Sequence, residues 1–219
     1  MKVAIAVVLA AFVAGCGGPN LSVSVRAGSP SAATASAPRA MVAATGIVLT
    51  RVRVVIRRVE LRKASSIEME EIASGPYLLD LSGASLDGPV TKVLDASFVP
   101  GAYDEIRFEL HKAETGETAA NASLKDMIDA QASIIAEGTI DGAAFSFTTA
   151  VTAEQRFDGA VNLQDGSNLT LNVDASSWFT SAGSRLDPRN EQNRSQIENN
   201  IQNSFQAFKD DNHDGQADA

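Results

Sequence analysis

The stretch Ile47–Leu61, IVLTRVRVVIRRVEL, decides the fold class, because β-branched residues alternate in it with arginines. Alternation with a period of two is typical of a half-buried β-strand. One face of this strand carries Val52, Val54 and Ile56. The phase slips at residues 57–58, so that Val59 and Leu61 fall on the opposite face. A β-bulge at this point would return them to the buried face.

Two alternatives concern the same stretch. A helix would also gather Val48, Val52, Val55, Ile56 and Val59 on one side, but so many β-branched residues favour the strand. The stretch also contains a basic cluster, whose members are Arg51, Arg53, Arg57, Arg58, Arg62 and Lys63. We interpret this cluster as the solvated face of a strand, and a patch for an anionic ligand or lipopolysaccharide is the alternative.

Further strands are predicted on both sides of this one. They cover residues 21–25, 77–81, 103–110, 134–140, 143–151, 160–163 and 169–173. Asp141–Gly142 and Asp165–Gly166 are two-residue turn signals, so we expect hairpins around both. The Ser-, Ala- and Pro-rich segment 28–40 is predicted to be a flexible linker. The pattern indicates a mainly β fold, an antiparallel β-sandwich or barrel.

Two helices are expected beside the strands. SLKDMIDA predicts a short inserted helix with Ser123 as N-cap and Leu124, Met127 and Ile128 facing inward. After a polar linker, Ser195 and Glu198 form a capping box for an amphipathic helix over residues 196–209. Its apolar stripe consists of Ile197, Ile201, Phe205 and Phe208. We expect this stripe to dock on the sandwich or on a partner.

The N-terminus, MKVAIAVVLAAFVAGC, is typical of a bacterial lipoprotein signal: a basic Lys2, a short apolar run and small residues before Cys16. The run is too short to span a bilayer, which needs about 20 apolar residues. We expect cleavage before Cys16, acylation of Cys16, and a membrane contact made through the lipid anchor. Gly17, where a retention signal would have Asp, favours sorting to the outer membrane of the cell envelope.

Composition limits the partners and the organisation of the chain. The 219 residues carry a formal net charge of −9, which argues against binding of nucleic acid or anionic lipid by charge. Cys16 is the one cysteine, so no internal disulfide can form. We expect a signal peptide at 1–15, a tether at 16–20, a β-sandwich domain at 21–183, and a helix with an acidic loop at 184–219.

The C-terminal segment DDNHDGQAD resembles the beginning of an EF-hand loop. Counted from Asp210 as position 1, oxygen donors fall at Asp210, Asn212, Asp214, Gln216 through its carbonyl, and Asp218, with Gly215 at the turn position. The glutamate of position 12 is missing, so we expect a weak calcium site like the shorter loops of dockerins and thrombospondin-type repeats. The alternative is an acidic, disordered tail that binds no ion.

No catalytic motif is present in the sequence, and we expect a protein that is not an enzyme. His111 and His213 are the only histidines, and both are expected to face solvent. The acidic pairs 70–71 and 104–105 could serve glycoside hydrolysis, but neighbouring residues of a strand point to opposite faces. Trp178 and Tyr103 could line a sugar-binding surface, yet aromatic residues at strand ends are more often part of the core.

The chain resembles a family of bacterial lipoproteins whose domain has no known function. The resemblance is carried by TGIVLTRVRVVIRRVEL, by YLLDLSG with VPGAYDEIRFEL, and by SIIAEGTIDGAAFSFTTA with LTLNVDASSWF. The resemblance covers most of residues 21–179 and implies a β-sandwich behind a lipobox. It implies no activity and no functional residues.

The expected function is that of a lipid-anchored binding or structural module. Its partner, an envelope protein or a glycan, is unknown. A carbohydrate-binding or adhesive domain is the alternative, and a hydrolase is the third possibility.

Overall fold

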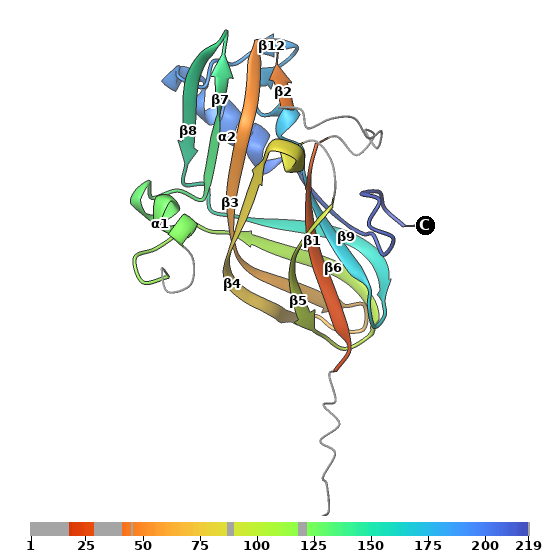
Figure 1. The fold of residues 1–219 in the computed structure, drawn as a ribbon. Helices are drawn as coiled ribbons and strands as arrows, with labels where there is room; N and C mark the ends of the chain where they lie inside the picture. Colours follow the sequence, from red (N-terminus) through yellow and green to blue (C-terminus); the bar gives the residue numbers. More distant parts are fainter. Residues whose placement is uncertain (1–17, 29–40, 45, 87–89, 118–121, 219) are drawn as a thin grey trace, which may run out of the picture.

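The computed structural model describes residues 18–28, 41–44, 46–86, 90–117 and 122–218 (Figure 1). The expected signal peptide, Cys16 and most of the expected linker at 28–40 lie outside the described residues. Within them the chain is mainly β and forms two packed sheets, a sandwich that does not close into a barrel. The expected fold class is therefore confirmed.

The smaller sheet has four strands in the order β13-β10-β1-β5. Their bounds are Phe205–Lys209 for β13, Asn168–Val173 for β10, Asn20–Ala27 for β1 and Thr91–Ser97 for β5. Strands β1 and β10 run parallel, whereas the other two pairs are antiparallel. This sheet thus joins the beginning of the described chain to its end.

The larger sheet is built around β3, a strand of 17 residues from Ile47 to Lys63. One edge of β3 pairs with β7 along its first half and with β6 along its second half, and the other edge pairs with β2 and then β4. The outer strands β8 and β9 pair with β7 and β6. The bounds are Met41–Ala44 (β2), Met69–Ser82 (β4), Gly101–Leu110 (β6), Ile134–Ile140 (β7), Ala143–Thr149 (β8) and Ala153–Leu163 (β9).

The expected bulge in β3 is present. Its register shifts between Ile56 and Arg58 against both β4 and β6, and Arg57 is exposed while Val59 and Leu61 return to the core. Opposite the bulge lies Gly75 of β4, where a Cβ atom would stand 2.7 Å from the Ile56 carbonyl oxygen. The bulge therefore requires glycine at this position, because any side chain would collide with backbone atoms.

The hairpin of β7 and β8 is also confirmed. Asp141 and Gly142 both have positive φ, 49° and 83°, as the primed two-residue turns of hairpins need. The other expected hairpin, around Asp165–Gly166, is wrong. Strand β9 pairs with β6 of the larger sheet and β10 pairs with β1 and β13 of the smaller one, so this turn carries the chain from one sheet to the other.

Replacing Gly142 by valine is expected to destabilise the domain by about 1 kcal/mol or more, because the β-branched residue would have to keep a positive φ. No atom lies within 4 Å of a Cβ built on Gly142, so the cost comes from the backbone alone. Chemical denaturation measures the effect. Gly159→Val in β9, which is equally open but has no positive φ, is the control and should leave the midpoint nearly unchanged; equal midpoints for both variants would contradict the assigned turn.

The inserted helix α1 spans Ala122–Asp129, and its Leu124 and Met127 are buried as expected. Because α1 begins at Ala122, Ser123 lies in its first turn and is not the N-cap. The helix covers Val55 and Ile135 on the outer face of the larger sheet, where these side chains form a second small apolar cluster. Among the described residues, no helix is long and apolar enough to cross a membrane.

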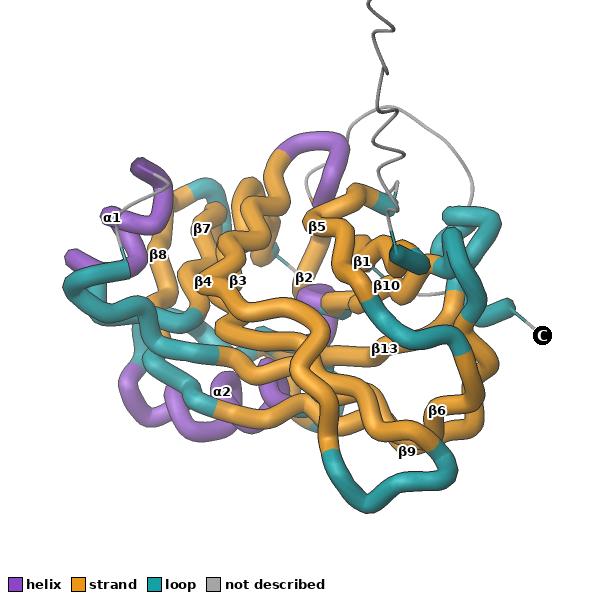
Figure 2. Tube along the Cα trace, turned by 90° about the horizontal axis from the view of Figure 1, so that it is seen from below, coloured by secondary structure: helices purple, strands orange, loops and turns teal. Residues whose placement is uncertain are grey.

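The C-terminal helix is shorter than expected. Helix α2 spans Arg194–Gln202, and residues 205–209 form strand β13 instead. Ser195 lies inside the helix and Asn193 stands at its N-cap without a side-chain cap bond, so the expected capping box is wrong. Ile197 and Ile201 pack into the main core, which places α2 across the sheet from α1 (Figure 2). The helix thus docks on the sandwich.

Short elements connect these parts. They are the 3-10 helices η1 (Gly83–Leu86), η3 (Ala175–Ser177) and η4 (Glu191–Asn193), and the strands β11 (Thr180–Ser181) and β12 (Ser184–Arg185), which pair with each other. Trp178 and Phe179, between η3 and β11, are fully buried.

Candidate functional site

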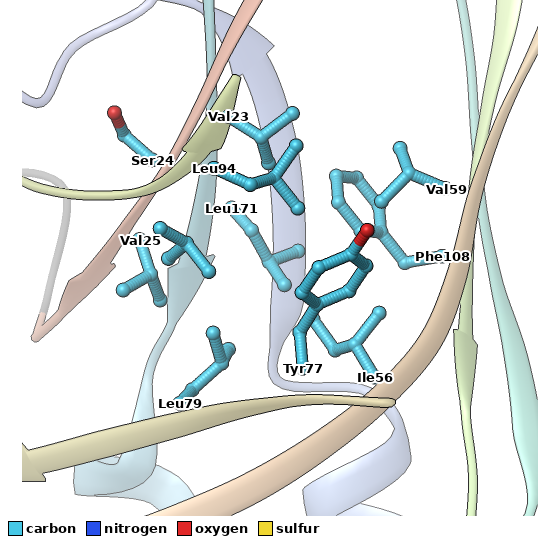
Figure 3. Close-up of a pocket in the computed structure, with 11 residues that line it drawn as sticks. Val23, Ser24, Val25, Ile56, Val59, Tyr77, Leu79, Leu94, Phe108 and Leu171 are labelled. Atoms are coloured by element: carbon cyan, nitrogen blue, oxygen red, sulfur yellow. The ribbon is translucent and has the colours of Figure 1, made fainter. Parts of the chain in front are cut away.

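A cavity lies between the two sheets, where the side chains of β1 and β10 face those of β3, β4 and β6 (Figure 3). Apart from Ser24 and the Tyr77 hydroxyl, its lining is aliphatic or aromatic carbon. The Ser24 hydroxyl donates a hydrogen bond to Asn168 Oδ1 and is therefore already paired. The cavity measures about 10 Å³, which is close to the minimum for a single water molecule. It is a packing gap of the core and offers no room for a ligand.

The basic cluster of β3 is neutralised by carboxylates on neighbouring strands, on α1 and on β3 itself. Each of its cations lies within 4 Å of at least one carboxylate: Arg51 of Asp80 and Glu137, Arg53 of Asp126 and Glu137, Arg57 of Glu109, Arg58 of Glu60 and Glu109, Arg62 of Asp104 and Glu105, and Lys63 of Glu70. The hydrogen bond from Arg51 lowers the pKa of the Asp80 carboxyl. The cluster is a charge-balanced sheet face, and nothing in these contacts favours the anionic-ligand alternative.

Glu105 is the most enclosed carboxylate of this face, with only 2% of its side chain exposed. Arg62 Nη1 and Arg156 Nε lie 2.9 Å from its oxygens, and Arg107 Nη2 lies 3.4 Å away. The expectation that the side chains of Asp104 and Glu105 point to opposite faces of the sheet is wrong. The register of β6 against β9 shifts between Tyr103 and Glu105, and Arg62 contacts both carboxylates. Both acids are held in ion pairs with arginine.

The acidic loop at residues 210–218 is folded. Asp210 Oδ1 and Asn212 Oδ1 both accept the Asp214 N–H, at 3.0 and 2.9 Å, so these two oxygens lie close together. Asp214 Oδ1 in turn accepts the Gln216 N–H at 2.8 Å. The side chains at positions 1, 3 and 5 of the expected calcium loop therefore bind the backbone of the loop itself.

Asp218, the remaining carboxylate of the expected donor set, makes different contacts. Asp218 Oδ2 accepts the Asp211 N–H at 2.7 Å and lies 3.7 Å from Lys209 Nζ. Burial pushes the pKa of Asp211 upward, but hydrogen bonds from Lys209 and from the Asn168 N–H outweigh it, and its pKa is lowered overall. Lys209 thus sits between two carboxylates beside the loop.

The outer face of the smaller sheet holds this loop in place. Asp210 is fully buried, and its carboxylate accepts the Thr170 hydroxyl at 2.8 Å and the Gly215 N–H at 3.1 Å. The buried Arg26 of β1 donates to the Gly215 carbonyl at 2.7 Å. A Cβ on Gly215 would stand 2.7 Å from Arg26 Cδ, and its φ is 79°, so only glycine fits here.

These supports from the sheet were not predicted from the sequence. Ser24 and Arg26 on β1, and Asn168 and Thr170 on β10, alternate with buried apolar residues, which is a signal for a polar sheet face. This alternation does not predict that the loop at residues 210–218 folds over that face. The four polar residues are buried as a result.

The described residues contain no group of three or more His, Cys, Asp and Glu side chains placed to hold a metal ion. His213 is exposed in the loop, as expected. His111 is buried, which contradicts the expected exposure: its N–H continues the pairing with β3 by donating to the Val55 carbonyl, and its Nε2 lies 3.4 Å from Glu117 Oε1.

The aromatic residues that could have formed a sugar-binding surface are buried. Trp178 and Tyr103 are both fully enclosed, and the large hydrophobic side chains exposed in the described parts of the chain are Val42, Ile67 and Val99, none of them aromatic. A carbohydrate-binding surface usually offers exposed aromatic rings. Nothing in the described surface therefore favours the carbohydrate-binding alternative.

The protein is thus an open β-sandwich whose C-terminal segment folds back onto one sheet as a compact acidic loop. No protein-family model matches the chain, and no curated protein sequence matches it. Among solved structures, the chain is similar to MbnP from Methylosinus trichosporium, with 14% sequence identity, a TM-score of 0.40, and coverage of 74% of this chain and 76% of that chain.

Proposed function

We propose that the protein is a lipid-anchored lipoprotein of the bacterial cell envelope that acts as a non-catalytic binding or structural module. The lipobox-like residues 1–16 support the anchor at Cys16. The resemblance to lipoprotein domains of unknown function agrees with the β-sandwich that follows. The outer membrane is the proposed location, because the residue after Cys16 is glycine.

The proposal includes a calcium site in the 210–218 loop, and the conformation of that loop is the observation that carries it. Asp210 and Asn212 share one N–H, which brings two candidate donors close together. A carboxylate has about four lone-pair sites, and Asp210 uses three of them, so one remains for a cation. Asn212, Asp214, Gln216 and Asp218 would complete the donor set.

The same contacts explain why the site would be weak. Asp218 is held away from the other donors by the Asp211 N–H, and the Lys209 ammonium beside it repels a cation. We therefore expect a dissociation constant of about 0.1–1 mM, in the range of extracellular modules. Such a site fills in a calcium-rich exterior.

Calcium at about tenfold above this dissociation constant is expected to stabilise the protein by about 1.4 kcal/mol, which raises the melting temperature by a few degrees. Asp214→Ala should remove the increase and leave the sandwich folded, because Asp214 is exposed and bonds only within the loop. The measurement is thermal unfolding in calcium and in chelator.

Asp129→Ala is the matched control, because it removes an exposed carboxylate from α1 and not from the loop. This variant should respond to calcium like the parent. A melting temperature of the parent that is the same in millimolar calcium and in chelator would show that the segment is an acidic loop without an ion site.

A further inference from the structure

We propose that the end of the sandwich where β1 begins docks on the lipid bilayer through Ile67 and Val99. This inference rests on the proposed lipid anchor at Cys16 and specifies which surface of the domain faces the membrane. It follows from where the tether enters the fold and which side chains stand beside it.

Hydrogen bonds gather three loops at this end (Figure 1). The loop between β5 and β6 joins the tether, because Phe98 donates its N–H to the Pro19 carbonyl. The turn after β9 joins it as well, since Gly166 donates to the Asn20 carbonyl. The tip between β3 and β4 is tied to the start of β6, where Ala64 donates to the Ala102 carbonyl.

Two of these loops expose large aliphatic side chains. Ile67, at the tip between β3 and β4, is 95% exposed, and Val99, between β5 and β6, is 52% exposed. Both loops are ordered by their own bonds: the Tyr103 hydroxyl donates to the Val99 carbonyl, and Ser66 donates to the Lys63 carbonyl. The fold therefore presents these side chains to the outside.

The tether leaves little distance between this end and the membrane. Cys16 lies four residues before Asn20, the first residue of β1, and four residues reach at most about 14 Å when fully extended. An acylated Cys16 sits at the surface of the bilayer. The loops beside Asn20 must then lie at or near the headgroup region, where apolar side chains bury into the boundary between headgroups and acyl chains.

Lipid suits this surface better than a protein partner or a charged polymer. Two separate side chains cannot bury the ~800 Å² per partner that a stable protein interface needs. The loop segments 64–68, 98–100 and 164–166 contain no lysine or arginine, so attraction to anionic lipid does not contribute. The contact is apolar, and it should occur on neutral lipid and persist at high salt.

The test uses the acylated full-length protein in phosphatidylcholine vesicles. Acylation consumes the Cys16 thiol, so Ile67→Cys and Val99→Cys each introduce a single free thiol for an environment-sensitive dye. Val42→Cys is the matched control, because Val42 is an exposed aliphatic residue of β2, at the opposite end of β3 (66% exposed). Spin-labelled lipids then report which dyes touch the bilayer.

The dyes at positions 67 and 99 are expected to shift to shorter wavelength and to lose most of their emission to spin-labelled lipid, with no change in high salt. The dye at 42 should keep its emission. If all three dyes behave like that at 42 while the protein floats with the vesicles, docking is refuted and the anchor stands. If the protein is not acylated and does not float, the proposed anchor fails, and docking fails with it.

Discussion

Replacing Trp178 by alanine is expected to lower the free energy of unfolding by about 3–5 kcal/mol, the range for removal of a buried aromatic ring. Trp178 is fully buried, and its indole N–H donates to Ser204 Oγ at 2.6 Å. Ser204 lies between α2 and β13, and its hydroxyl donates a hydrogen bond to the Ile201 carbonyl. The ring thus connects the end of the smaller sheet to the C-terminal segment that completes it.

Equilibrium denaturation followed by circular dichroism measures this loss. Trp178→Phe is the control, because it keeps an aromatic ring but removes the donor, and it should cost about 1–2 kcal/mol. The difference between the two variants is the contribution of packing. If Trp178→Ala unfolds at the same denaturant concentration as the parent, the indole is not part of the core.

Replacing Cys16 by serine is expected to abolish acylation completely and to leave the chain as an unprocessed precursor that keeps residues 1–15. The reason is chemical: the proposed anchor needs a bond from the lipid to sulfur, and a serine hydroxyl is a far poorer nucleophile than a thiolate. The mass of the purified chain reports whether residues 1–15 are retained. Gly17→Ala changes a neighbour without touching the thiol, and it should be processed like the parent; a precursor in both cases would indicate a defect unrelated to sulfur.

Two local patterns in the sequence correctly predicted local features of the fold, although the expected helix caps at Ser123 and Ser195 were wrong. The phase slip at residues 57–58 correctly indicated the β-bulge, because a strand with one buried face must compensate a shift of one residue. Asp141–Gly142 correctly indicated a hairpin, because both residues tolerate the positive φ that the turn demands. Each of these features depends on residues that are neighbours along the chain.

Features that depend on distant pairing were missed. Phe205 and Phe208 continue the helical spacing of Ile197 and Ile201, yet residues 205–209 form a strand, because the free edge of β10 offers a full ladder of hydrogen bonds. Phe205 and Ala207 then face the core with a period of two. The Asp165–Gly166 turn failed as a hairpin for the same reason, since the partner of β10 is β1, far away in the sequence.

The candidate site was predicted in part. The spacing of Asp210, Asn212 and Asp214 predicts a tightly wound loop. In the structure Asp210 and Asn212 share the Asp214 N–H, whereas Asp214 accepts the Gln216 N–H. The burial of Asp210 against Thr170, and the contact of Arg26 with Gly215, could not be predicted, because they arise only when the chain end returns to β1 and β10. Cys16 rests on the sequence alone.

Metabolic labelling with a palmitate analogue tests the central claim, the lipid anchor, most directly. The account predicts that the parent protein incorporates the label, that the label stays on the peptide that begins with Cys16, and that Cys16→Ser carries none. A parent chain without label, or a Cys16→Ser variant labelled as strongly as the parent, would contradict the account.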